Sequence, residues 1–171
     1  RHINDNDLKK IISKLRIPLN LEIAATLEML NIAIKHKPES ICIVPEKRKE
    51  VTTEGGLNLN YKKSFLKKTI KKLKEKKIKV SLFIESNFKD IKEAKKIGAD
   101  CIEFHTGKIC DLINKKKKFS AELSKLKKGV KLANSLNLEV HAGHGLTYDS
   151  AKILSKINNI SEFNIGHFLI G

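Results

Sequence analysis

The chain contains few of the residues on which several common kinds of protein depend. Its 171 residues include no tryptophan, three prolines and three cysteines. The cysteines form no C-x-x-C pair, so the sequence indicates neither a disulfide framework nor a zinc site. No apolar run approaches the roughly 18 residues that a membrane-spanning helix needs, and no charged-then-apolar leader follows Arg1. We expect a protein of a reducing compartment that has no membrane span and no signal peptide.

Arginine is also scarce, although basic residues are abundant. The net charge is +16, but only three of the 35 basic residues are arginines. A basic patch is typical of nucleic-acid binding, whereas bidentate recognition of phosphates and bases favours arginine. The lysines are densest at 62–79, above an apolar helical stripe, where lysine is normally solvated. We therefore expect a solvated basic surface and no nucleic-acid partner.

The chain alternates between helical and strand-like hydrophobic patterns. Asp5 or Asp7 is expected to cap the first helix, Thr26 to begin the second, and Gly98 to end the fourth. Six short apolar runs read as strands, at 19–22, 40–44, 78–84, 101–104, 138–142 and 163–165. The intervening helices are expected at about 8–15, 26–36, 62–77, 87–97, 119–136 and 148–157.

Strict alternation of helices and apolar strands predicts an α/β fold with a parallel sheet. No G-x-G-x-x-G follows the first strands, which disfavours a dinucleotide-binding open sheet. Polar residues gather after the strand ends, which is the pattern of a (β/α)8 TIM barrel. Such barrels usually take about 250 residues. We therefore expect residues 1–171 to be a single barrel domain, truncated at both ends, with about six of its eight strands.

Two consecutive turns combine glycine with histidine. The segments are G-H-G-L, after the fifth expected strand, and I-G-H-F, after the sixth. Barrel enzymes often bind phosphate with the loops after their last two strands. Gly145, Gly166 and His167 are therefore candidate phosphate contacts, although these glycines could serve only to form tight turns.

Three titratable residues are candidates for acid–base chemistry. Glu22 and Glu103 each end an apolar strand, where they could exchange protons or pair with one of the many lysines. His144 lies between two glycines in a turn, whereas His141 lies on a strand and could simply fill the barrel. No H-x-H or H-E-x-x-H spacing is present, so we expect no metal.

Six segments together resemble the pyridoxine 5′-phosphate synthase family. The most specific is V-P-E-K-R-K-E-V-T-T-E-G-G, and all six fall in the family order across the whole chain. The other five are L-N-L-E, V-S-L-F-I-E, I-E-F-H-T-G, A-G-H-G-L-T-Y and N-I-G-H-F-L-I-G. The resemblance implies a cytoplasmic (β/α)8 enzyme of vitamin B6 synthesis, a homo-octamer that uses no metal or organic cofactor. It condenses 1-deoxy-D-xylulose 5-phosphate with 3-amino-2-oxopropyl phosphate, and releases pyridoxine 5′-phosphate, inorganic phosphate and water.

The resemblance also implies roles for individual residues. Glu22 matches a proton acceptor, His144 a proton donor, and Glu103 the glutamate that stabilises the transition state. The phosphorylated substrates give the remaining matches: His2 and Thr52 for the deoxyxylulose phosphate, and Gly145, Gly166 and His167 for the aminoketone phosphate.

The sequence departs from the family in two respects. The family's N-x-D-H-x-A-T-x-R motif is absent, as are the catalytic histidine and substrate-binding arginine that precede R-H-I in relatives. His141 also stands where relatives commonly have asparagine, which places an extra titratable group near the barrel mouth. Three alternatives therefore stay open: a nucleic-acid-binding module, another phosphate-binding barrel that acts on a single sugar phosphate, and an inactive fragment.

Overall fold

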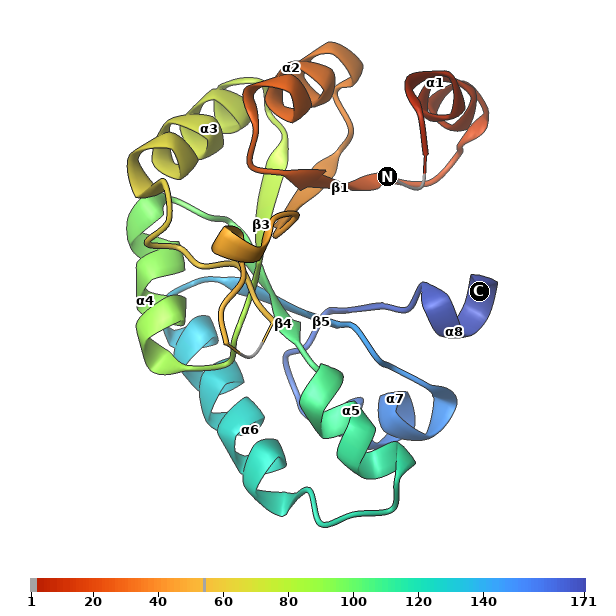
Figure 1. The fold of residues 1–171 in the computed structure, drawn as a ribbon, viewed down its shortest axis with the longest axis vertical. Helices are drawn as coiled ribbons and strands as arrows, with labels where there is room; N and C mark the ends of the chain where they lie inside the picture. The colour runs from red at the N-terminus through yellow and green to blue at the C-terminus, as the bar shows by residue number, and fades with distance from the viewer. Residues whose placement is uncertain (1–2, 54) are drawn as a thin grey trace.

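Six parallel strands form one curled sheet in the computed structural model, which describes residues 3–53 and 55–171. Each strand pairs with the next one along the chain, in the order β1-β2-β3-β4-β5-β6. The strands are β1 (Asn20–Ala24), β2 (Ser40–Val44), β3 (Lys79–Ile84), β4 (Cys101–His105), β5 (Glu139–Gly143) and β6 (Glu162–Asn164). The sheet curls into half a barrel (Figure 1), in which β1 and β6 do not pair with each other. This confirms the expected α/β fold with six strands of a TIM barrel.

Helices cover the convex side of the sheet. In Figure 1, α2, α3, α4 and α6 follow one another around the outside of the curve. The helices are α1 (Asp5–Lys14), α2 (Leu27–His36), α3 (Lys63–Glu75), α4 (Phe88–Ile97), α5 (Gly107–Asn114), α6 (Ser120–Ser135), α7 (Tyr148–Leu154) and α8 (His167–Ile170), with a short 3₁₀ helix, η1 (Arg48–Glu50). Among the described residues, none of these helices combines the length and apolar character that crossing a bilayer requires.

Most of the expected helix boundaries are confirmed, with one correction at the start. The Thr26 side chain caps α2, Asn87 caps α4, and Gly98 ends α4 with a φ of +98°. The cap of α1 is Asn4, however, and neither Asp5 nor Asp7. Asn4 Oδ1 accepts the amide of Asp7 at 3.0 Å, while Asp7 Oδ2 accepts the amide of Asn4 at 3.0 Å. This reciprocal capping box satisfies two amides at once, which a single aspartate cap would not do.

Helix α5 (Gly107–Asn114) was not expected from the sequence. It begins two residues after β4 and buries Ile109, Cys110 and Ile113. Its eight residues are too few for a strong periodic signal, and its first residue is a glycine, which disfavours helix. Helix α7 also ends earlier than expected, at Leu154.

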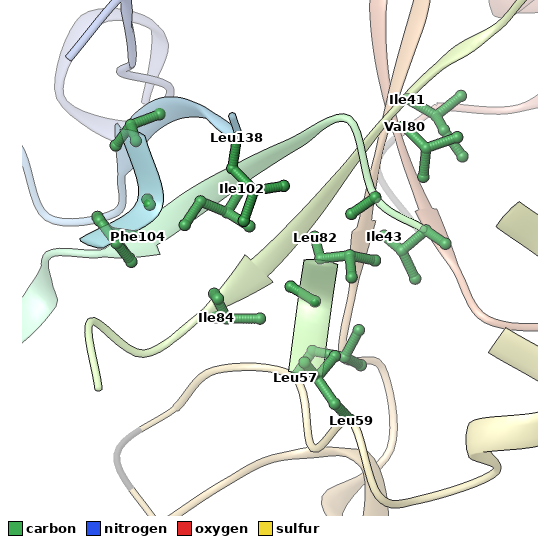
Figure 2. Close-up of a cluster of buried hydrophobic side chains, with 14 of the residues drawn as sticks. Ile41, Ile43, Leu57, Leu59, Val80, Leu82, Ile84, Ile102, Phe104 and Leu138 are labelled. Carbon is green, nitrogen blue, oxygen red and sulfur yellow. The ribbon is translucent and has the colours of Figure 1, made fainter. Parts of the chain in front are cut away.

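The two faces of the sheet differ in polarity. The convex face supplies the apolar core, in which Ile43, Leu82, Ile84, Ile102 and Phe104 pack between strands and helices (Figure 2). Because side chains alternate along a strand, the residues between these face the barrel interior. They are mostly polar or small: Glu22, Cys42, Ser81, Glu103, His141, Glu162 and Asn164. The barrel interior is therefore the polar side of the fold.

The lysines of α3 differ in the contacts that they make. Lys74 Nζ lies 2.7 Å from Asp100 Oδ1 and donates to the Gly98 carbonyl at 3.1 Å, so it ties α3 to the end of α4. Lys71 lies 3.9 Å from Glu75 on the same helix, and Lys67 is exposed.

We expect Lys67→Gln and Lys71→Gln to change the free energy of unfolding by less than about 0.5 kcal/mol, because exposed substitutions rarely cost more. Lys74→Gln should cost more, up to about 1 kcal/mol, because it removes a surface ion pair and a hydrogen bond. Urea unfolding of the three variants measures the difference. Equal losses for Lys67 and Lys74 would show that the Asp100 pair contributes nothing.

Candidate active site

Glu103 lies in the middle of β4 and faces the barrel interior, where it is buried. Its Oε2 accepts a hydrogen bond from Asn164 Nδ2 of β6 at 2.8 Å. Burial, and then the negative charge of Glu22, raise the pKa of Glu103 from its usual 4.5 to about 7. A carboxyl group with a pKa near neutrality can both hold and release a proton under physiological conditions.

Gly143 is the residue that leaves room for Glu103. It ends β5, and a Cβ at this position would lie 1.9 Å from Glu103 Oε1 and 2.9 Å from its Cδ. No side chain other than hydrogen fits there unless the carboxyl group moves. Gly143 is therefore a point of close approach to a candidate catalytic group.

Glu22 shares the interior face with Glu103. It lies on β1 in register with Cys42 of β2, and it is exposed. Its charge raises the pKa of both Glu103 and Cys42. The structure therefore brings the two glutamates singled out in the sequence into one electrostatic environment.

His144 directly follows β5 and Gly143. Its backbone has a φ of +77°, a strained region for a residue with a side chain. The Thr106 hydroxyl holds this turn, because it lies 2.7 Å from the Gly143 carbonyl oxygen and 2.9 Å from that of His144. Partial burial of the ring, and then the charge of His105, lower the pKa of His144. A protonated His144 would therefore be a stronger acid than an ordinary histidine.

The loop that carries Thr52 folds over the ends of β3 and β4. The Thr52 amide donates to the Gly56 carbonyl at 2.7 Å, and the Gly55 amide lies 3.3 Å from the Thr52 carbonyl oxygen. Buried Glu50 accepts the amides of Glu46 and Lys47 at 3.0 and 3.3 Å, which fixes the start of the loop. Thr52 is thus held on a backbone turn close to the C-terminal ends of β3 and β4.

The two glycine–histidine turns lie at neighbouring strand ends, because Gly143 pairs with Asn164. Gly145 has a φ of +77°, and a Cβ there would lie 3.3 Å from the Gly107 Cα. Gly166 precedes α8 in open space, with no atom within 4 Å of an added Cβ. His167 is exposed on α8. His2, the remaining candidate, lies outside the described residues.

His141 lies beside Glu103, because the two residues are in register on β5 and β4. It is buried in β5, where its Nε2 lies 2.9 Å from Glu139 Oε1 near the start of the strand. Glu139 also pairs with Lys79 Nζ at 2.5 Å. An extra titratable group therefore lies beside the candidate catalytic Glu103, and it is buried as a residue that fills the barrel would be. Among residues 3–53 and 55–171, no group of three or more histidines, cysteines and acidic residues could hold a metal ion.

Two further residues lie at the C-terminal ends of neighbouring strands, and sequence reasoning missed them. Glu85 follows β3 and His105 ends β4, and His105 Nδ1 lies 3.3 Å from Glu85 Oε1. The sequence pattern marks both only as polar residues that follow apolar strands. Their positions one strand apart could have indicated a pair, since neighbouring parallel strands end at the same edge of the sheet.

The raised pKa of Glu103 predicts a pH dependence of stability. Between pH 4.5 and 7 the folded chain holds a proton on Glu103 that the unfolded chain has released. The free energy of unfolding should therefore fall by on the order of 3 kcal/mol as the pH rises through this window, and level off above 7. Glu103→Gln should lose this component. Urea unfolding of both proteins at several pH values tests it, and parallel pH curves for the two would contradict it.

Known proteins match this chain over its whole length. Residues 1–171 match the family model described as pyridoxal phosphate biosynthesis protein PdxJ. The chain is 54% identical to pyridoxine 5′-phosphate synthase of Pelagibacter ubique and 49% identical to that of Zymomonas mobilis. Each alignment covers 100% of this chain, but only 72% and 66% of the respective relative.

The similar solved structures inform only the fold. PaMucR phosphodiesterase has a TM-score of 0.59 at 14% identity, over 85% of this chain and 58% of that one. An EAL domain protein from Listeria monocytogenes has a TM-score of 0.60 at 14% identity, over 92% and 62%. These proteins share the curved α/β arrangement at a level of identity that says nothing about chemistry.

Proposed function

The chain belongs to the PdxJ family of pyridoxal phosphate biosynthesis proteins, and on that basis we propose that it carries out the reaction of pyridoxine 5′-phosphate synthase. The enzyme condenses 3-amino-2-oxopropyl phosphate with 1-deoxy-D-xylulose 5-phosphate, and releases pyridoxine 5′-phosphate, inorganic phosphate and water. It would be classed as a transferase. The observation that carries the proposal is the buried Glu103, with a pKa near 7, next to the turn that bears His144.

The proposed chemistry needs several proton transfers and no single nucleophile. An amine condenses with a ketone, water and phosphate leave, and the ring closes through a carbon–carbon bond. Glu22 would accept a proton, since it is exposed at the barrel interior. His144, whose lowered pKa favours release, would donate one to a leaving oxygen. Glu103 would stabilise positive charge as it develops, because its carboxylate lies in a buried site.

The binding residues would hold the two phosphorylated substrates. Thr52 would contact the deoxyxylulose phosphate from its backbone turn, together with His2. Gly145, Gly166 and His167 would hold the aminoketone phosphate, since the two turns lie at neighbouring strand ends. At Gly145, the absence of a side chain lets the backbone approach an anion.

The remaining family properties are part of the proposal. We propose a homo-octamer in the cytoplasm, with no metal or organic cofactor and no nucleic-acid partner. We also propose that residues 1–171 form a single barrel domain that accounts for six of eight strands. The chain spans about 66–72% of the length of the relatives it matches, which agrees with two strands lying elsewhere in a full-length protein.

An omission experiment tests the reaction. The full-length protein that carries this sequence is incubated with both substrates, and pyridoxine 5′-phosphate is followed by mass spectrometry. Product should form only when both substrates are present, with one inorganic phosphate released per product. Turnover of deoxyxylulose phosphate without the aminoketone would instead support a barrel enzyme that acts on a single sugar phosphate.

A polypeptide of these 171 residues alone should form no detectable product. In the described sheet, β1 and β6 each pair with one neighbour, so the barrel interior that holds Glu22 and Glu103 is open at both edges. Open edges admit water and leave the groups poorly positioned. Product measured with the purified 171-residue chain and with the full-length protein checks this, and equal rates would contradict it.

A further inference from the structure

One carboxylate oxygen links the Thr52 loop to the histidines of the site. Glu85 is buried just after β3, and its Oε1 accepts the Gly56 amide at 2.9 Å. The same Oε1 lies 3.3 Å from Nδ1 of His105, whose side chain is only 12% exposed. The loop backbone also lies directly on the His105 ring, since a Cβ at Gly55 would be 2.8 Å from His105 Cε1. Moving Glu85 would therefore disturb both the loop and the ring.

His105 in turn lies against His144. The two rings have centroids 4.9 Å apart and are tilted by 44°, and Phe83 places its edge against both at 5.2 and 6.4 Å. The positions follow from the sheet, because His105 pairs with Gly143, the residue before His144. Gly107 keeps the pair close, as a Cβ there would lie 2.9 Å from His105 Nε2 and 3.0 Å from His144 Cδ2.

We propose that Glu85 and His105 are positioning residues for the reaction, Glu85 for the Thr52 loop and for His105, and His105 for the ring of His144. This rests on the proposed function, in which Thr52 binds substrate and His144 donates a proton. A carboxylate close to one histidine nitrogen favours a proton on that nitrogen and helps to orient the ring. When His105 is neutral, Glu85 favours its proton on Nδ1, and Nε2 lies on the side of Gly107 and His144.

Other charged groups surround the pair. Lys108, Glu122 and Lys125 line a small cavity with Glu85 and His105 on the side of α5 and α6. Lys108 Nζ lies 2.5 Å from Glu122 Oε1, so its charge is balanced within the cavity lining. Among the described residues, the titratable groups that contact His105 are the Glu85 carboxylate and the His144 ring.

Substitutions of His105 and of Glu85 test the two parts of the proposal separately. His105→Phe keeps a ring beside His144 and Phe83, but removes the contact with Glu85 and the charge that, after burial, lowers the pKa of His144. Glu85→Ala removes the acceptor of the Gly56 amide as well, whereas Glu85→Gln keeps an oxygen there. His36→Phe, in the last turn of α2, is the matched control for a histidine far from the sheet edge.

The measurements are steady-state kinetics of the full-length enzyme and an NMR titration of the His144 ring without substrate. In His105→Phe, the titration midpoint of His144 should move to higher pH, and kcat should fall about tenfold with KM for deoxyxylulose phosphate within about twofold. In Glu85→Ala, that KM should also rise about tenfold, and Glu85→Gln should restore it. The control should match the wild type in both measurements.

The outcomes that overturn the proposal differ from those that overturn the proposed function. An unchanged His144 titration in His105→Phe would mean that His105 does not act on His144. An unchanged KM in Glu85→Ala would mean that Glu85 does not hold the loop. If that variant does not fold, Glu85→Gln tests the contact with His105, and a kcat equal to that of the wild type would overturn this part of the proposal. If the wild-type enzyme forms no pyridoxine 5′-phosphate, the function fails, and the NMR titration still decides the link between the histidines.

Discussion

Replacement of His144 by asparagine should lower kcat of the full-length enzyme by roughly 10²–10⁴-fold, because it removes general acid–base catalysis at one step. Asparagine keeps a polar side chain and tolerates the positive φ of +77° at this position. It lacks a group that titrates near neutrality. Affinity for the aminoketone phosphate should therefore stay within a few-fold of the wild type.

Gly145→Val is the matched contrast to His144→Asn. It adds a β-branched side chain where φ is +77° and where a Cβ would already lie 3.3 Å from Gly107, so it should weaken phosphate binding first. Isothermal titration with an inert analogue of the aminoketone phosphate, together with steady-state rates, separates the two variants. Loss of binding in folded His144→Asn would make the histidine a phosphate ligand, and a kcat near that of the wild type would remove its acid–base role.

Gly143→Ala should reduce kcat at least 100-fold, although it adds a single methyl group and no charge. The methyl carbon would lie 1.9 Å from Glu103 Oε1, so the carboxyl group that accepts the Asn164 hydrogen bond must move. Loss of one preorganised electrostatic group in a buried site typically costs about 10²–10³ in kcat. Steady-state rates of the full-length variant give the measurement, and circular dichroism checks the fold.

A double-mutant cycle identifies the cause of that loss. If Gly143→Ala acts through Glu103, it should cost nothing further in a Glu103→Ala background, where the clashing carboxyl group is absent. Additive losses in the double variant would mean that the methyl group harms the site by another route, such as a shift of the His144 turn.

The strands and their order could be predicted from the sequence because their patterns are local. The run at 40–44 matches β2 (Ser40–Val44) at both ends, and Thr26 and Gly98 act where the sequence placed them. The short helix α5 could not be predicted in this way, since tertiary packing of Ile109 and Ile113 outweighs its weak local propensity.

Some residues of the candidate site could likewise be predicted from the sequence, and others could not. Glu22, Glu103 and His144 stood out because the sequence placed each titratable residue at the end of an apolar run. The structure corrects this for the two glutamates, which lie in the middle of β1 and β4 on one interior face, because both strands continue beyond them. The need for glycine at 143 and the contact from Glu85 to Gly56 span 40 and 29 residues of sequence. No local pattern encodes such contacts, because they depend on which strands become neighbours and on how far a side chain reaches across them.

The most direct measurement is the rate of pyridoxine 5′-phosphate formation by full-length Glu103→Gln at saturating concentrations of both substrates. Glutamine keeps the shape of the side chain and an oxygen for Asn164, but it cannot carry the negative charge. If the condensation takes place at the site that contains Glu103 and His144, the rate should fall at least 100-fold while the inert phosphate analogue still binds. A rate close to that of the wild type, with the fold intact, would show that the reaction occurs without Glu103 and would contradict the site described above.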